Sequence, residues 1–211
     1  MTRLRLYTIH VRIWHWLQAL SMLTLLATGA AIHWPTVPGP LSFQHMVWLH
    51  NAAAAVFLTN AFLGLFYYFT SGELRQLIPH LRGLFEQLRL QARYYLGGIF
   101  RGEPHPLART SEARLNPLQR VTYLVILNVL LPFEALTGAV LWSRHIWPGL
   151  AEHFGGPALI GLLHTSGAWL LAAFLLAHLY LITTGPRITS YFMAMLTGAE
   201  ELPEQHLAER T

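Results

Sequence analysis

Residues 157–184 read PALIGLLHTSGAWLLAAFLLAHLYLITT and contain no Asp, Glu, Lys or Arg. A helix needs about 20 mostly apolar residues to cross the roughly 30 Å hydrocarbon core of a membrane, so this stretch is long enough to span one. Runs of this kind occupy residues 13–32, 43–69, 121–142 and 157–184. The sequence therefore predicts an all-α integral membrane four-helix bundle over residues 1–198, followed by a short acidic tail at 199–211.

The composition agrees with a membrane environment. Hydrophobic residues make up 54% of the chain and charged residues only 11%, whereas soluble proteins carry about 25% charged residues. The formal net charge of +4 comes from arginines that flank the predicted spans. We therefore expect these charges to meet lipid headgroups, and we expect no nucleic-acid partner.

The positions of the arginines predict the orientation of the chain. With the N-terminus in the cytoplasm, every arginine except Arg144 lies on the cytoplasmic side of the four spans. Cytoplasmic loops of membrane proteins are enriched in Lys and Arg. We therefore expect a multi-pass protein whose termini and long middle loop are cytoplasmic.

The loop between spans two and three has an amphipathic pattern that begins near Glu73. Its apolar residues recur at three- and four-residue spacing: Leu74, Leu77, Ile78, Leu81, Phe85 and Leu88. Arg75, Arg82 and Arg89 fall on the other face. The pattern predicts a helix on the cytoplasmic membrane surface, ended by the glycines at 97–98 and by the segment 102–106.

Histidines inside the predicted spans are the candidate functional residues, because ionisable groups are rare in membranes and usually functional. They are His15, His50, His164 and His178. A helix rises about 1.5 Å per residue, which places His50 and His164 toward the outer side and His15 and His178 toward the cytoplasm. His164 and His178 are 14 residues apart, so they lie about 40° apart around the helix and about 21 Å apart along it. One helix face thus offers a ligand to each of two stacked sites.

Two histidines at each depth favour haem iron, which has two axial positions. Zinc is the rival, but it prefers three or four protein ligands at one level. The chain has no Cys, which excludes thiolate ligands and covalent haem attachment through C-x-x-C-H. His45 competes with His50 on the second span, but it lies five residues shallower than the His164 level requires. We therefore expect two haems b, with those four histidines as axial ligands.

Glycines at the matching positions of spans one and two support two stacked sites. Gly29 lies 14 residues after His15, and Gly64 lies 14 residues after His50. Each ligand-bearing helix thus has a glycine on the same face at the depth of the other site, where a flat macrocycle needs close approach of the backbone. The alternative is that Gly29 and Gly64 are ordinary helix-packing glycines.

Short motifs occur in or beside all four spans: Arg12-Ile-Trp-His15-Trp with Thr28-Gly29, Val47-Trp-Leu-His50, Asn116-Pro-Leu-Gln119-Arg120, and His164 with Ala177-His178-Leu-Tyr180. Together they resemble the bacterial di-haem cytochrome b subunits of respiratory nickel–iron hydrogenases, formate dehydrogenase and thiosulfate reductase. The fourth span, with two histidines 14 residues apart, carries the most specific part of this resemblance.

The resemblance implies a membrane anchor of a bacterial inner membrane, an electron-transfer subunit rather than an independent catalyst. Electrons would pass between the iron–sulfur clusters of a molybdenum or nickel partner on the outer side and a quinone, menaquinone or ubiquinone. His50 and His164 would hold the outer haem, and His15 and His178 the inner one.

The resemblance also places the quinone near the inner haem, with Asn116 and Gln119 as contacts. Read from the residues alone, Asn116 is equally a helix N-cap, with Pro117 at the first helical position. Glu134 is the one acid in the predicted spans. It has three possible roles: to bond backbone freed by a kink at Pro132, to face the outer haem, or to face a partner helix.

Two other functions compete with the subunit hypothesis. A stand-alone di-haem cytochrome would pass electrons from a small donor to quinone. A transporter would use the intramembrane histidines as a proton relay, although four helices with one buried acid offer little for a transport pathway.

Overall fold

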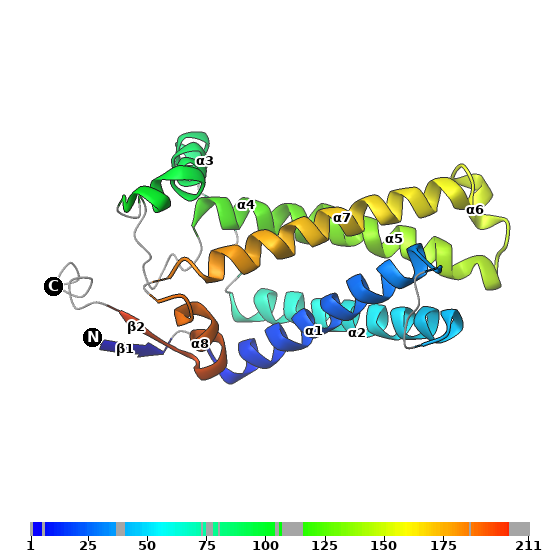
Figure 1. The fold of residues 1–211 in the computed structure, drawn as a ribbon, viewed down its shortest axis with the longest axis horizontal. Helices are drawn as coiled ribbons and strands as arrows, with labels where there is room; N and C mark the ends of the chain where they lie inside the picture. The colour runs from blue at the N-terminus through cyan, green and yellow to red at the C-terminus, as the bar shows by residue number, and fades with distance from the viewer. Residues whose placement is uncertain are drawn as a thin grey trace. The chain divides into compact units, whose positions relative to one another are not determined.

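The computed structural model describes residues 2–5, 7–36, 41–72, 74, 78–79, 81–103, 106, 116–185 and 187–202. The elements in chain order are β1 (Thr2–Arg5), α1 (Ile9–His33), α2 (Phe43–Ser71), α3 (Leu84–Arg93), η2 (Tyr94–Gly98), η3 (Ile99–Arg101), α4 (Pro117–Val125), η4 (Ile126–Leu130), α5 (Leu131–Trp142), η5 (Ser143–His145), α6 (Leu150–His153), α7 (Pro157–Ile182), α8 (Ser190–Thr197) and β2 (Ala199–Leu202) (Figure 1).

The long helices confirm the predicted spans. Four helical stretches are long and apolar enough to cross a membrane: Ile9–His33, Phe43–Ser71, Pro117–His145 and Pro157–Ile182. The first three enclose the predicted spans, and the fourth ends two residues before the predicted 184. Thr183 and Thr184 follow it in a turn, and their hydroxyls bond carbonyls of the last helical turn at 2.7 and 2.8 Å.

Large apolar side chains on these helices are exposed instead of packed into a core. The exposed fractions of Ile13, Phe62, Leu136 and Leu176 lie between 62% and 69%. Exposing apolar surface to water costs roughly 25 cal/mol of free energy for each Å². Lipid tails are as apolar as leucine, so exposure to lipid has no such cost. The exposed side chains and the lengths of the helices together make the chain a multi-pass membrane protein.

The described residues form two compact units. One consists of residues 1–64 and 165–211, and the other of residues 65–164.

Within the first unit, a buried polar cluster joins α1 to α2. The Asn60 side-chain amide donates to the Trp14 carbonyl at 3.0 Å and to Gln18 Oε1 at 2.7 Å. The Trp14 indole N–H donates in return to the Asn60 carbonyl at 2.9 Å. Asn60 is 6% exposed, so this reciprocal bonding satisfies polar groups that have no water around them.

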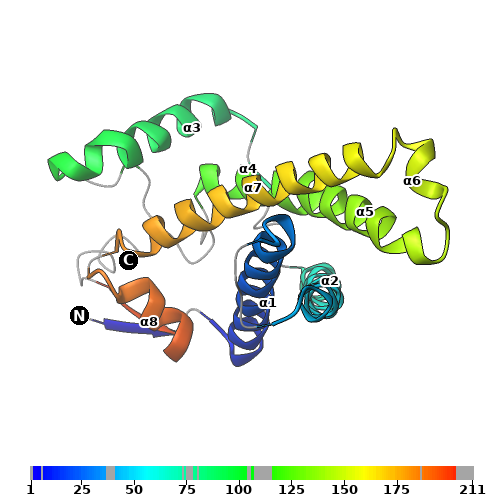
Figure 2. The same cartoon turned by 45° about the vertical axis from the view of Figure 1, so that its right-hand side comes forward.

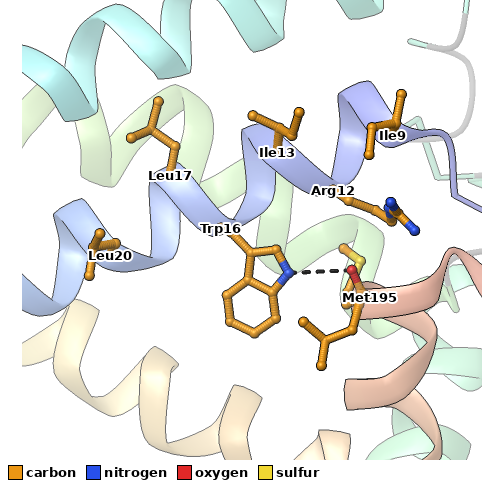
Figure 3. Close-up of a pocket in the computed structure, with 8 residues that line it drawn as sticks. Ile9, Arg12, Ile13, Trp16, Leu17, Leu20 and Met195 are labelled. Atoms are coloured by element: carbon orange, nitrogen blue, oxygen red, sulfur yellow. Dashed lines mark hydrogen bonds between the residues drawn. The ribbon is translucent and has the colours of Figure 1, made fainter.

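The start of α1 packs against α8 through Trp16. The Trp16 indole N–H donates to the Met195 carbonyl at 3.3 Å, as the dashed line in Figure 3 shows, and its ring lies edge-on to Phe192 at 5.5 Å between centroids. Beside this contact lies a groove lined by apolar side chains, with Arg12 next to them (Figure 3).

The all-α fold class predicted from the sequence is confirmed, and one short two-stranded antiparallel sheet accompanies the helices. β1 pairs with β2, with Thr2 opposite Leu202, and Tyr7 N–H donates to the Gly198 carbonyl at 3.1 Å. The two strands lie side by side in Figures 1 and 2. Gly198, at φ +84°, ends α8 and turns the chain into β2, a backbone conformation that glycine adopts without steric cost. The sequence analysis placed the start of β2 in a tail, because a four-residue strand leaves no periodic pattern.

Within the second unit, α4, η4 and α5 form one continuous helix with a π-helical turn in its middle (Figure 1). In the π turn the N–H of Leu131 bonds the carbonyl of Ile126, five residues earlier. The next residue is Pro132, which has no N–H and whose ring crowds the preceding turn. The widened turn accommodates the proline within a membrane span. The helix distortion considered near Pro132 is therefore a π-helical turn directly before it.

The predicted amphipathic helix begins later and continues further than its pattern indicated. α3 begins at Leu84 after Gly83, whose φ is +69°. Of the residues before it, positions 73, 75–77 and 80 lie outside the described part of the chain. The glycines at 97–98 do not end the helix: it runs on as η2 and η3 to Gly102, at φ +68°. The Gly98 carbonyl accepts from the Glu103 N–H at 3.0 Å, beyond the π-helical segment, so the chain stays hydrogen-bonded past the glycines.

Candidate functional site

His15 on α1 and His178 on α7 lie together within the first unit. Their ring centroids are 6.2 Å apart, with planes tilted by 43°. His15 also lies edge-on to Trp16 at 5.3 Å, and His178 lies beside Phe174 at 5.9 Å. Two histidines from the first and last spans are thus neighbours, and aromatic side chains lie beside them.

The geometry of this pair fits a metal with two axial imidazoles. An imidazole nitrogen bonds a transition metal at about 2 Å, so two rings on opposite sides of one ion have centroids about 6 Å apart. The buried Nδ1 of His15 has no hydrogen-bond partner among the described residues. In the part of the chain that the structure describes, no three His, Asp or Glu side chains gather at a metal site. Two nitrogen donors from two helices therefore match a haem iron better than a zinc ion.

His50 on α2 is held by the first helix. Its Nδ1 lies 2.9 Å from the Thr28 hydroxyl oxygen. That hydroxyl donates its own proton to the Thr24 carbonyl at 2.7 Å. Gly29 follows directly, and a Cβ placed there would lie 3.5 Å from His50 Cε1. The glycine predicted at the depth of the outer histidines thus adjoins His50.

His164, in the first half of α7, has the same surroundings within the second unit. Its Nδ1 lies 3.0 Å from the Thr137 hydroxyl, which donates to the Phe133 carbonyl at 2.8 Å. Gly138 follows, and a Cβ there would lie 3.1 Å from His164 Cε1. Thr137 and Gly138 were not among the predicted site residues, although the tripeptide Thr-Gly-Ala, which occurs at 28–30 and again at 137–139, indicates them.

Glu134 also contacts His164. Its Oε2 lies 3.1 Å from His164 Nδ1, and the two side chains are 13% and 23% exposed. The other oxygen, Oε1, is buried and has no hydrogen-bond partner among the described residues. Three roles were left open for Glu134. Its contact with His164, a predicted ligand of the outer haem, favours the role in which it faces that haem.

The glycine predicted at the inner site has a different neighbour. A methyl group on Gly64 would overlap the indole of Trp14. The absence of a side chain at Gly64 therefore makes room for the aromatic ring that bonds to Asn60. Its helix-packing role is visible in this contact, while a contact with a macrocycle stays a prediction.

Asn116 and Gln119 form the N-terminal capping box of α4. The Asn116 side-chain oxygen accepts from Gln119 N–H at 2.8 Å, and the Gln119 side-chain oxygen accepts from Asn116 N–H at 3.1 Å. The capping interpretation is confirmed, with Pro117 at the first helical position. The Asn116 amide also donates to the Tyr95 hydroxyl at 3.1 Å, a neighbour that the sequence analysis did not identify.

Comparison with known proteins identifies the family of the chain. Residues 6–198 match the family described as prokaryotic cytochrome b561. The chain is 33% identical over 202 residues to the Escherichia coli K12 protein named cytochrome YdhU, covering 93% of this chain and 74% of that one. Proteins named as Ni/Fe-hydrogenase B-type cytochrome subunits are also similar. The one from Rhizobium leguminosarum is 30% identical, covering 82% of this chain and 78% of its own. The one from Azotobacter vinelandii is 27% identical, covering 85% and 80%.

The resemblance inferred from the four short motifs is therefore confirmed over nearly the whole chain. The chain belongs to the prokaryotic cytochrome b561 family, and it is a multi-pass membrane cytochrome of the b type that works in electron transport.

Proposed function

We propose that this chain is a di-haem cytochrome b that anchors a respiratory oxidoreductase to the bacterial inner membrane and passes electrons between that partner and quinone. The observation that carries the proposal is the pair His15 and His178, whose rings approach to 6.2 Å on membrane-spanning helices. These two residues would hold the inner haem, and His50 and His164 the outer one.

The chain's own residues supply position and surroundings, while each bound haem supplies one-electron transfer. His15 and His178 approach from α1 and α7, so these two helices would hold the haem between them. Trp16 and Phe174 lie beside the two rings, and such apolar neighbours would influence the redox potential of a bound haem.

The partner is proposed from the relatives. Several of them carry the name of a Ni/Fe-hydrogenase B-type cytochrome subunit. We propose a catalytic subunit with iron–sulfur clusters and nickel or molybdenum, docked on the outer side of the membrane. Co-purification of such a subunit supports this arrangement, and a chain isolated alone that still reduces quinone from a small donor supports the stand-alone alternative.

The quinone is proposed to react at the cytoplasmic end near Asn116 and Gln119. Asn116 is buried, at 5% exposure, and its amide bonds the Tyr95 hydroxyl. An amide N–H and a phenol are the kinds of donor that bind a quinone carbonyl. Leu96 and Phe100 follow Tyr95 in η2 and η3. Their exposed apolar side chains offer a surface for an isoprenoid tail.

Haem stoichiometry tests the proposed function. We expect two haems b per chain, both extractable by acid acetone because the chain has no Cys for a covalent bond. His15→Ala and His178→Ala are each expected to remove one haem, the same one in both cases. His50→Ala and His164→Ala are expected to remove the other.

His45→Ala is the matched control, since this exposed histidine bonds only locally, to Ser42 at 2.7 Å. It should retain both haems. One haem per chain, or loss of haem in His45→Ala with retention in His50→Ala, would contradict the ligand assignment. A protein without any reduced-minus-oxidised haem spectrum would instead favour the transporter hypothesis.

A further inference from the structure

Two threonine–glycine pairs on different helices make matching contacts with two different histidines, and His164 Nδ1 has a further neighbour in Glu134 Oε2 at 3.1 Å. Thr28 and Gly29 on α1 adjoin His50, and Thr137 and Gly138 on α5 adjoin His164. The oxygen-to-Nδ1 distances are 2.9 and 3.0 Å. Each arrangement occurs within its own unit, so the two are independent observations of one geometry.

The hydrogen bonds of the hydroxyls decide which histidine nitrogen carries the proton. A threonine hydroxyl has one proton to donate. Thr28 donates it to the Thr24 carbonyl at 2.7 Å, and Thr137 to the Phe133 carbonyl at 2.8 Å. With the hydroxyl protons directed to those carbonyls, the arrangement fits an Nδ1–H on each histidine that donates to the hydroxyl oxygen. A neutral imidazole protonated at Nδ1 has its lone pair on Nε2.

The glycines bring each ring against a helix backbone. A Cβ at Gly138 would lie 3.1 Å from His164 Cε1, closer than packed carbon atoms normally approach. At Gly29 the corresponding distance to His50 Cε1 is 3.5 Å, which is ordinary contact. The threonine fixes the rotation of the ring, and the glycine sets how near it lies to the helix.

We propose that Thr28-Gly29 and Thr137-Gly138 are two copies of one positioning device, which holds a haem-ligand histidine by Nδ1 and presents Nε2 to the iron. The inference rests on the proposed ligand role of His50 and His164 and extends it to their orientation. Metal-bound histidines are generally oriented by a hydrogen bond at the other nitrogen, which also strengthens them as donors. His15 differs, because its Nδ1 has no such partner among the described residues. The device therefore belongs to one haem of the two.

Valine variants of the full-length haem-loaded protein test this proposal, because valine keeps the shape of threonine and removes the hydroxyl. Thr28→Val and Thr137→Val are each expected to raise the midpoint potential of one haem and leave the other unchanged, since a weaker donor stabilises ferric iron less. The same haem should shift its low-spin EPR signal and begin to bind carbon monoxide when reduced. Thr28→Ser and Thr137→Ser should behave as the wild type.

Thr24→Val is the matched control, because among the described residues the Thr24 hydroxyl bonds only the Leu20 carbonyl in its own helix, at 2.9 Å. It should leave both potentials unchanged. Gly138→Ala should perturb the same EPR signal, because a methyl group there would press on His164.

Each outcome bears on the proposal. Valine variants with unchanged potentials, EPR signals and carbon monoxide reactivity would overturn it. If a valine variant loses one haem, retention in the serine variant supports the device, and loss in the serine variant overturns it. If Thr28→Val and Thr137→Val alter different haems, the device stands and the pairing of His50 with His164 in the proposed function is wrong.

Discussion

At the scale of single residues, a side chain in this protein often has two roles that one substitution would remove together. Asn116 caps α4 through its oxygen and donates to Tyr95 through its nitrogen. A polar residue at a helix start thus combines a structural role, visible in the sequence, with a proposed contact to quinone. Substitutions that keep one atom and remove the other separate these roles.

Asn116→Ser is therefore expected to keep the cap and lose the amide donor. Serine is as good a cap as asparagine, so the thermal stability and both haem spectra should stay the same. Quinone-linked turnover should fall about tenfold, as expected for the loss of one hydrogen bond of about 1.4 kcal/mol. Turnover is measured with a short-chain quinone and compared with the rate at which haem is reduced.

Asn116→Leu is the comparison variant, because it loses both the cap and the amide. It should slow turnover as Asn116→Ser does and also cost about 1 kcal/mol of stability. Normal turnover in Asn116→Ser, with reduced stability in Asn116→Leu, would leave the residue as a cap and move the quinone elsewhere.

The four span histidines could be predicted at this scale because each is a costly ionisable group in an apolar run. Thr28 and Thr137 could not be predicted in the same way, since a threonine in a helix usually bonds its own backbone. Both do so here, and their contact with a histidine depends on a neighbouring helix. Glu134 was ambiguous for the same reason, because its partner His164 belongs to the next span.

At the scale of elements, the contact of α1 with α2 depends on a few polar groups in an apolar setting. Asn60 supplies two of these hydrogen bonds from its side chain. Interhelical hydrogen bonds are prominent in membranes, where lipid offers no competing partners. The pairing of these helices should therefore be sensitive to this one amide.

Asn60→Ala is expected to destabilise the protein by about 1–3 kcal/mol, because the Trp14 carbonyl and Gln18 Oε1 lose their partner in a buried place. The measurement is thermal unfolding in detergent, followed by haem absorbance. Asn128→Ala is the matched control, since exposed Asn128 only bonds the Leu124 carbonyl of its own helix at 2.9 Å. Equal stability of the two variants would show that the buried cluster does not hold α1 to α2.

The long helices were predictable because hydrophobic length alone decides them, and their ends agree within a few residues. The helix that begins with α3 was predicted to begin too early and to end too early, since glycines at 97–98 end most helices but here form part of a π-helical segment. The β1–β2 pair was not predictable, because residues 2–5 and 199–202 find each other only in the folded chain.

At the scale of the whole molecule, the distribution of charge rather than any contact predicts the direction of insertion. Every arginine except Arg144 lies outside the outer loops if both termini are cytoplasmic. Because such a bias controls insertion by the translocation machinery, the orientation is expected to be uniform.

A cytoplasmic reporter fused after Thr211 should therefore be active, and a reporter of export inserted near Gly149 should be active as well. The control is the same pair of reporters exchanged between the two positions, which should both be silent. An exported C-terminal reporter would overturn the orientation and, with it, the proposed cytoplasmic location of the quinone.

The pairing of β1 with β2 has a consequence for the order in which the protein is made. Residues 65–164 form a unit from one continuous stretch, which can assemble while the ribosome is still at work. The other unit joins residues 1–64 to residues 165–211, so β1 is made first and cannot pair until β2, at residues 199–202, has been translated. His15 likewise cannot contact His178 until α7 has been translated. The site that these two residues form is therefore completed late in biogenesis, and a nascent chain stalled before α7 can be expected to lack it, however long it waits.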